Sequence, residues 1–265
     1  MLVEMETISA NHWNACDLSR LDKSQLHAVR NRMMRQDERS DLERHGFFLG
    51  CRKQTVELLL GGAFLQKFPA RLELAREGDP ADFLHVVIDG SVEIFATHAE
   101  RETTLGIVRP PNTFIVASVA LDRIYLASAR VLEPARILLI PANSIRKAMV
   151  EDGAFATTIA TELADAYRNN VRELKNQKLR SSLERLAAWI LLRDRETGAT
   201  HRFTIPFEKK VLAARMGIGP EALSRSFATL AKYNVVINGA EVQIREPEAL
   251  QRLAKLNPLI DDPDS

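Results

Sequence analysis

Three polar residues, Glu221, Ser224 and Arg225, have the types and the spacing to read base pairs. On a helix, residues three and four positions apart share one face. Arginine can bond guanine twice, a carboxylate can accept from cytosine N4, and a hydroxyl can contact a base or a phosphate. The simpler interpretation is that Glu221 and Arg225, four residues apart, form an exposed ion pair.

The surrounding segment predicts an element that would present this face. Residues Glu208 to Leu230 suggest two short helices broken at Gly217, where Ala213 permits a close crossing and Pro220 fits the second helix's first turn. The inward positions are Leu212, Met216, Ile218, Leu223 and Phe227, and the basic residues nearby are Lys209, Lys210 and Lys232. This pattern predicts a helix-turn-helix whose second helix meets a DNA groove.

A β-hairpin is predicted directly after these helices. Residues 235–244 alternate in polarity around Asn238-Gly239, the pair typical of a type I′ turn, and would form a wing.

The distribution of charge along the chain agrees with a DNA-binding function. The net charge of the chain is +1, but residues 172–255 hold 16 Lys and Arg against 9 Asp and Glu, a segment charge of +7. This part of the chain is suited to a polyanion such as DNA.

The middle of the chain predicts a β domain. A helix is expected at Gln54 to Gln66, and Pro69 marks the change to β-type periodicity. Turn signals such as Asp89-Gly90 and Glu133-Pro134 separate six expected strands. The strands are Leu72 to Arg76, Phe83 to Ile88, Ser91 to Thr97, Thr103 to Val108, Leu126 to Leu132 and Arg136 to Ile140. Many short strands at near-regular spacing suggest a closed roll or jelly roll.

One long apolar stripe separates the two parts. Its members recur at intervals of four or three residues: Phe155, Ile159, Leu163, Tyr167, Val171 and Leu174. Such a stripe favours a two-helix seam between two copies of the chain, although packing on its own β domain stays open. A further helix, Ser181 to Asp194, is expected to pack within the last domain.

The expected fold class is therefore α+β, with a β-roll, a long dimerisation helix and a winged helix-turn-helix. The domain boundaries that we predict are a helical N-terminal extension at 1–45, a β-roll sensor domain at 46–142, a dimerisation helix at 143–178, a DNA-binding domain at 179–256 and an acidic tail at 257–265.

Over roughly three quarters of its length the chain resembles the CRP/FNR superfamily of bacterial transcription regulators. The matching phrases are EGDPADFLHVVIDGSVEIF from Glu77, YLASARVLEPARILLIP from Tyr125 and KLRSSLERLAAWILL from Lys178. The E-x-x-S-R pattern of Glu221, Ser224 and Arg225 is similar to FNR, FixK and DNR/NnrR-type readers. The resemblance implies a homodimeric regulator that binds a TTGAT-N4-ATCAA-like palindrome on double-stranded DNA, with RNA polymerase as an expected partner and activation as an expected role.

The chain departs from members that bind cyclic nucleotides. They hold the ligand with a Gly-Glu pair and an Arg-Ser pair, where this chain has Val116-Ala117-Ser118 and Tyr125-Leu126. Arg123 stands two residues away from the expected position. The effector pocket is thus expected at Ala117, Ser118, Tyr125 and Leu126, and it is poorly suited to cAMP because a phosphate needs a paired cation.

The identity of the sensed signal stays open. Haem is one candidate, with His85, His45, His98 or Cys51 as nominal ligands, and an unrecognised small ligand or effector-independent regulation are the others. Two cysteines, Cys16 and Cys51, cannot supply the four thiolates of an iron–sulfur cluster, and no other metal site is expected.

Enzymatic and membrane functions are not expected. The chain lacks GxSxG, HExxH, P-loop and GxGxxG motifs, and it has no apolar run long enough to span a bilayer and no secretory signal. The expected location is the cytoplasm. The rival interpretation is a cyclic-nucleotide-binding-like scaffold or regulatory subunit that does not bind DNA.

Overall fold

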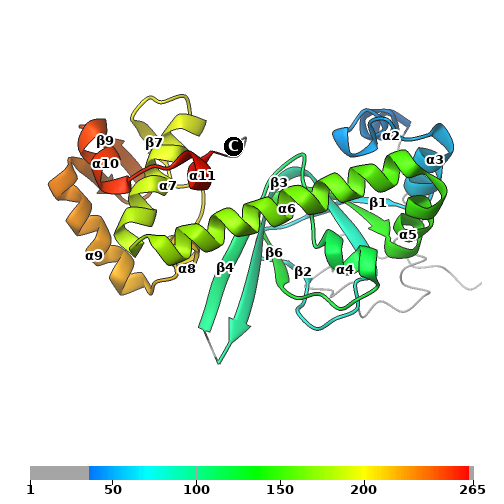
Figure 1. Cartoon of the computed structure of the whole chain (residues 1–265), viewed down its shortest axis with the longest axis horizontal. Helices are drawn as coiled ribbons and strands as arrows, with labels where there is room; N and C mark the ends of the chain where they lie inside the picture. The colour runs from blue at the N-terminus through cyan, green and yellow to red at the C-terminus, as the bar shows by residue number, and fades with distance from the viewer. Residues whose placement is uncertain (1–35, 100, 263–265) are drawn as a thin grey trace, which may run out of the picture. The chain divides into compact units, whose positions relative to one another are not determined.

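The structure, a computed structural model, describes residues 36–99 and 101–262 (Figure 1). Most of the expected N-terminal extension lies outside the described residues, and of this segment we describe α2 (Gln36–Glu43). Within the described ranges, 36–92 and 108–151 make up one compact unit, whereas 93–107 and 152–262 make up a second.

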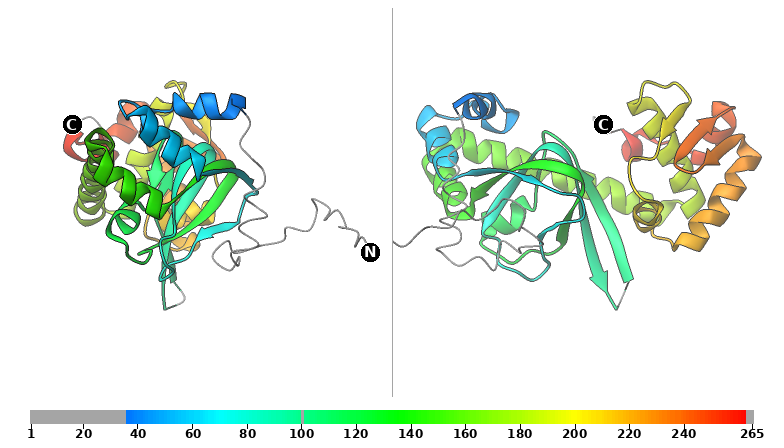
Figure 2. Two further views of the ribbon diagram at one scale, coloured as in Figure 1. Left: turned by 90° about the vertical axis from the view of Figure 1, so that its right-hand side faces the viewer. Right: turned by 180° about the vertical axis from the view of Figure 1, so that it is seen from behind.

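The first unit contains most of an antiparallel sheet, in which the end of β3 and nearly all of β4 belong to the second unit. A short helix η2 (Gly46–Phe48) and helix α3 (Lys53–Gly61) precede it, and α4 (Val116–Leu121) and α5 (Ala142–Glu151) accompany it. The strand order is β1-β6-β3-β4, while β2 pairs with β6 and β5 pairs with β3. The strands are β1 (Phe64–Phe68), β2 (Glu73–Ala75), β3 (Phe83–His98), β4 (Arg101–Val108), β5 (Thr113–Phe114) and β6 (Ser128–Pro141). Strands β3 and β4 are neighbours in this sheet and form a hairpin, drawn in teal (Figure 2).

Two of the predicted strand breaks are wrong. Strand β3 continues through Asp89-Gly90, and β6 continues through Glu133-Pro134. Gly90 has a φ of +82°, and a Cβ there would lie 2.5 Å from the Pro134 carbonyl oxygen. Gly90 therefore allows the backbones of two long strands to approach each other closely, which is one of the known roles of glycine inside a strand.

The predicted helix at Gln54 to Gln66 is too long. Helix α3 ends at Gly61, and β1 begins at Phe64, which pairs with Leu139 of β6. The apolar run that spans this boundary could not distinguish a helix from a buried strand, because periodicity is uninformative when every position is apolar.

His85 lies in the core of the first unit. Its side chain is 2% exposed, and its ring stacks on Phe114 at 4.8 Å between centroids. Among the described residues, its Nδ1 atom has no hydrogen-bond partner. Burial lowers the pKa of His85 to about 4. The folded state therefore holds this imidazole in its neutral form.

We expect His85 to make the first unit less stable in mild acid. The unfolded chain binds a proton near pH 6.5 and the folded chain only near pH 4, so stability is present above the unfolded pKa and is lost as the pH falls between these values. Between about pH 7.5 and about pH 5 the loss is about 2 kcal/mol. Urea unfolding at both pH values should show this loss reduced in His85→Phe and kept in His98→Phe, whose histidine is exposed. An equal pH dependence in both variants would contradict the assignment.

The second unit contains α6 (Gly153–Leu179) and the elements that follow it. Helix α7 (Ser182–Glu196) packs against α10 (Pro247–Ala254) and contacts α9 (Pro220–Leu230). A three-stranded antiparallel sheet has the order β7-β9-β8. Its strands are β7 (Arg202–Thr204), β8 (Val235–Asn238) and β9 (Glu241–Ile244), and the remaining helices are α8 (Lys209–Arg215), η3 (Ala231–Tyr233) and α11 (Pro258–Asp261).

The segment predicted as one dimerisation helix, 143–178, contains two helices. Helix α5 ends at Glu151, and Asp152 caps α6 by accepting a hydrogen bond from the Ala154 N–H at 3.0 Å. An aspartate at this position satisfies one of the donors that a helix start leaves unpaired. The apolar stripe is also divided: Phe155 and Ile159 are fully buried within the single chain, whereas Tyr167 and Leu174 are exposed.

Candidate nucleic-acid interface

Helix α7 supports the DNA-binding part of the second unit. It begins at a capping box, in which the Ser181 hydroxyl accepts from the Glu184 N–H and the Glu184 carboxylate accepts from the Ser181 N–H at 2.7 Å. Its buried residues Leu186 and Ile190 belong to one core cluster with residues of the sheet, α8, α9 and α10. The prediction that the helix at Ser181 to Asp194 packs within the last domain is confirmed.

The turn between α8 and α9 has the expected chemistry. Gly217 has a φ of +66°, the Ile218 N–H donates to the Ala213 carbonyl at 3.0 Å, and the Gly217 N–H donates to the Ala214 carbonyl at 3.0 Å. These two bonds form a Schellman motif, which ends α8 and turns the chain toward α9. Of the predicted inward residues, Leu212, Met216 and Leu223 are buried, and Ile218 and Phe227 pack against the same core.

Two side chains from earlier elements hold this turn. The Arg185 guanidinium, on α7, donates to the Met216 carbonyl at 2.7 Å and to the Arg180 carbonyl at 2.6 Å. Gln177, on α6, donates to the Arg215 carbonyl at 3.4 Å. Burial lowers the pKa of Arg185. Sequence reasoning missed both residues, because their partners are carbonyl groups, which carry no sequence signal.

The outward face of α9 presents the three residues predicted to read bases. Glu221, Ser224 and Arg225 are all exposed in the first half of the helix, opposite the buried Leu223. Among the ion pairs of residues 36–99 and 101–262, none joins Glu221 to Arg225. The Ser224 hydroxyl donates to the Pro220 carbonyl at 3.0 Å. Both charged side chains are thus open to a ligand.

The three nearby lysines have different surroundings. Lys209 lies over the Phe227 ring, with its Nζ 5.5 Å from the ring centroid. The Lys210 Nζ lies 3.8 Å from a carboxylate oxygen of Glu102, and Lys232 is exposed in η3. All three positive charges can still contact phosphates, but Lys209 also contributes to packing.

The wing is present, although its turn is shifted by one residue from the prediction. Asn238 pairs with Glu241, so the central turn residues are Gly239 and Ala240. Only Gly239 has a positive φ, of +61°. This pattern is typical of a type II′ turn and not of the type I′ turn predicted for Asn238-Gly239.

The β3–β4 hairpin also contacts α8 within the second unit. The Thr103 hydroxyl donates to the Ala214 carbonyl at 3.4 Å, and the Thr104 hydroxyl lies 3.5 Å from the Val211 carbonyl. The Thr104 hydroxyl also lies 2.5 Å from a carboxylate oxygen of the buried Glu93. The sequence did not predict these contacts, because more than 100 positions separate the two segments.

The four residues expected to line an effector pocket differ in burial, so they do not line one common cavity. Ser118 and Tyr125 are buried, whereas Ala117 is exposed and Leu126 is 78% exposed. The Tyr125 hydroxyl donates to the Phe83 carbonyl at 3.1 Å, and burial raises its pKa to about 12. Its ring centroid lies 6.4 Å from that of His85, so Tyr125 itself occupies the interior of the roll.

The nominal haem ligands lie in unlike environments. His45 accepts a hydrogen bond from the Phe47 N–H at the start of η2, His98 is exposed at the end of β3, and Cys51 is half-buried. Cys16 lies outside the described residues. Across 36–99 and 101–262, no three His, Cys, Asp or Glu side chains are grouped as metal ligands would be.

A β-roll, a long helix and a winged helix-turn-helix together define a DNA-binding regulator that carries a domain of ligand-binding type. Comparison with known families agrees with this class. Residues 65–152 match the cyclic nucleotide-binding domain family, and residues 184–253 match the Crp-like helix-turn-helix domain family. The chain belongs to the CRP/FNR superfamily of transcription regulators, as its sequence indicated.

Similar proteins match this chain over most of their own length. The chain is 27% identical over 209 residues to the cyclic AMP receptor protein of Thermus thermophilus, covering 78% of this chain and 95% of that protein. It is 24% identical over 220 residues to the CRP-like cAMP-activated global transcriptional regulator of Mycobacterium tuberculosis, covering 81% and 98%. The fold is that of FixK2 from Bradyrhizobium japonicum, with a TM-score of 0.63 and 18% identity over 72% of this chain and 96% of FixK2.

These similarities place the chain among transcription regulators with a DNA-binding helix-turn-helix. The curated relatives are regulators and not enzymes. In the part of the chain that the structure describes, no helix is both long enough and apolar enough to traverse a bilayer.

Proposed function

We propose that the protein is a homodimeric transcription regulator that binds TTGAT-N4-ATCAA-like palindromes through α9. The observation that carries this proposal is that Glu221, Ser224 and Arg225 share one exposed face of α9. In the described chain, Glu221 and Arg225 do not form an ion pair with each other, so both side chains can contact DNA. Residues near the N-terminus of a recognition helix are those that meet base edges. The E-x-x-S-R order supports the TTGAT half-site.

The exposed part of α6 supports dimerisation. Tyr167, Val171 and Leu174 are 70%, 38% and 58% exposed in the single chain and recur at four and three residues. That interval is the a/d spacing of a two-stranded coiled coil, and a monomer would leave these side chains in water. To meet successive major grooves, the two α9 helices of such a dimer must lie about 34 Å apart. Recruitment of RNA polymerase is the expected consequence.

We further propose that the sensor domain does not use cAMP, although both curated relatives carry cAMP in their names. A bound phosphate needs a cation, and the pair Tyr125-Leu126 offers none. Tyr125 fills the interior of the roll, and Leu126 is exposed. Burying the phosphate of cAMP without a cation would weaken its binding by several kcal/mol, as for other uncompensated buried charges.

Fluorescence anisotropy with labelled duplexes tests the proposed function. At one fixed salt concentration we expect the TTGAT-N4-ATCAA duplex to bind about a thousandfold more tightly than a scrambled duplex of equal composition. Adding cAMP should leave the binding midpoint unchanged. Equal binding of both duplexes would refute base reading by α9, and absence of binding to either would favour the scaffold interpretation. Stronger binding with cAMP would overturn the sensor proposal and identify Arg123 as the cation.

A further inference from the structure

The junction between α6 and α7 is only two residues long. Arg180 and Ser181 both have extended backbone, with φ and ψ of −121° and 144° at Arg180. Helix α6 carries the proposed dimer seam, and α7 carries the core that supports α9. The backbone angles of two residues therefore set how each recognition helix is oriented relative to the seam, and an unsupported two-residue link would leave that orientation variable.

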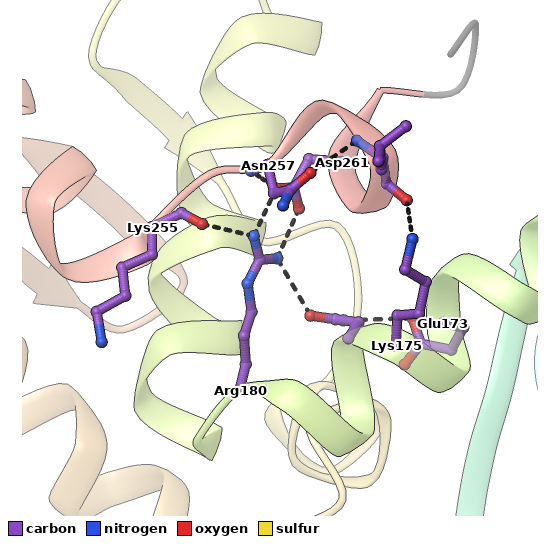
Figure 3. Close-up of polar contacts among 8 residues, drawn as sticks. Glu173, Lys175, Arg180, Lys255, Asn257 and Asp261 are labelled. Carbon is purple, nitrogen blue, oxygen red and sulfur yellow. Dashed lines mark hydrogen bonds and ion pairs between the residues drawn. The ribbon is translucent and has the colours of Figure 1, made fainter.

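The Arg180 side chain is fixed by groups from the C-terminal end of the chain (Figure 3). Its guanidinium donates to both carboxylate oxygens of Asp261, at 2.7 and 2.6 Å, and to the Lys255 carbonyl at 2.9 Å. A third partner is the Asn176 side-chain oxygen at 3.3 Å, on α6 itself. The side chains of Arg180 and Asp261 are only 5% and 8% exposed. This is a buried bidentate pair between residues 81 positions apart.

The segment that supplies Asp261 is itself ordered by local bonds. Asp261 accepts from the Asn257 N–H at 2.6 Å, and the Asn257 side chain caps α11 by accepting from the Leu259 N–H at 2.9 Å. These bonds make residues 255–261 a compact turn that presents one carboxylate to the junction. Part of the segment predicted as an acidic tail is thus a structured element with a buried acid.

The same segment contacts both helices that meet at the junction. The Lys175 Nζ, on α6, donates to the Leu259 carbonyl at 3.2 Å. The Lys255 Nζ lies 2.6 Å from a carboxylate oxygen of Glu184, on α7. Lys255 and the Ser181 N–H lower the pKa of Glu184 to about 2, so this pair stays ionised at neutral pH. The segment therefore braces the junction from both sides.

We propose that residues 255–261 form a brace on the α6–α7 junction, in which Asp261 and Arg180 are positioning residues for DNA binding. By fixing the junction, the brace makes the dimer selective for one separation of the two half-sites. Neither residue needs to touch DNA. The inference rests on the proposed function, since it assumes a dimer that reads a palindrome.

Half-site separation gives a direct readout of this role. One added base pair turns the second half-site by about 35° and moves it by about 3.4 Å. A rigid dimer cannot engage both half-sites after this change and loses its avidity, which is worth about 100-fold or more. A dimer with a loose junction can follow the displaced half-site. The measured quantity is the ratio of affinities for N4 and N5 duplexes with identical half-sites.

The test compares Asp261→Asn with Asp262→Asn in the full-length chain. Asp262 is the exposed neighbour, so both variants lose one acidic charge. We expect the wild type and Asp262→Asn to prefer N4 over N5 by about 100-fold, and Asp261→Asn to prefer it by less than about tenfold, with the preferred half-site sequence unchanged. An unchanged ratio in Asp261→Asn would overturn the brace.

Asp261→Asn leaves the buried Arg180 with its charge uncompensated, which destabilises the fold. Two further variants test the brace in case Asp261→Asn does not fold. Lys175→Met breaks a peripheral contact of the brace and creates no buried charge. Its lost charge weakens both duplexes alike, so a lowered N4 to N5 ratio supports the brace and an unlowered ratio counts against it. In Arg180→Gln with Asp261→Asn, the ratio should fall no further than in the Asp261 variant alone, and a further fall opposes a shared role.

Hydrogen exchange separates a failure of the brace from a failure of the proposed function. Amides of residues 180–186 should exchange about tenfold faster in Asp261→Asn than in Asp262→Asn, without any DNA. Faster exchange in a protein that binds no palindrome would support the brace and refute the proposed operator. Equal exchange in the two variants would refute the brace, whatever the DNA result.

Discussion

Replacing Leu174 with glutamate should convert the dimer to monomers and lower the affinity for the palindrome by about 100- to 10,000-fold. The side chain is 58% exposed in the single chain, so the substitution should cost the monomer little. In a dimer the same position would face its partner across the seam, and two buried carboxylates would oppose each other. Each monomer would then bind one half-site without the avidity of the second.

Val150→Glu is the matched control for this prediction. Val150 is 88% exposed on α5, outside the stripe, and receives the same change of charge. Sedimentation equilibrium should show a dimer for the wild type and Val150→Glu, and a monomer for Leu174→Glu. Leu163→Glu is a less clear test, because Leu163 is already half-buried within the chain. A dimer that persists in Leu174→Glu would place the seam elsewhere.

The sequence predicted the helix-turn-helix of α8 and α9 well, because its structure depends on contacts between residues that are close in the chain. Gly217 adopts the positive φ that the break between the helices requires, and the two hydrogen bonds around it close within six residues. The periodicity of α9 alone separates Leu223 from Arg225. The wing followed from alternation, but its turn type did not, since it depends on which residues pair across the hairpin.

Contacts between distant segments could not be predicted in this way. Gly90 and Pro134 carried turn signals, yet they lie where two long strands approach each other. The Arg180–Asp261 pair joins two residues that each look like solvent-exposed charges in the sequence. The expected pocket residues alternate between inside and outside, because the backbone of the loop and not its composition decides which side chains point inward.

The second prediction concerns base reading by Arg225. Arg225→Ala should weaken binding to the preferred half-site by about 5- to 150-fold, which is the 1–3 kcal/mol of one bidentate contact to a base. The loss should be concentrated at one base pair of each half-site, because the alanine variant no longer distinguishes that pair. Arg225 is exposed on α9 and makes no ion pair with Glu221 in the described chain, so the fold does not depend on its charge.

Lys232→Ala is the control for this prediction. Lys232 is exposed beyond the end of α9. Loss of a lysine that contacts a phosphate weakens binding to every sequence about equally and reduces the slope of the salt dependence by about one. Lys209 is less suitable because its ammonium packs over Phe227. A library of half-site variants, ranked for each protein at one salt concentration, separates the two effects. If Arg225→Ala weakens all variants alike and keeps the wild-type ranking, Arg225 contacts the DNA backbone, and sequence reading must come from other residues of α9 or from the wing.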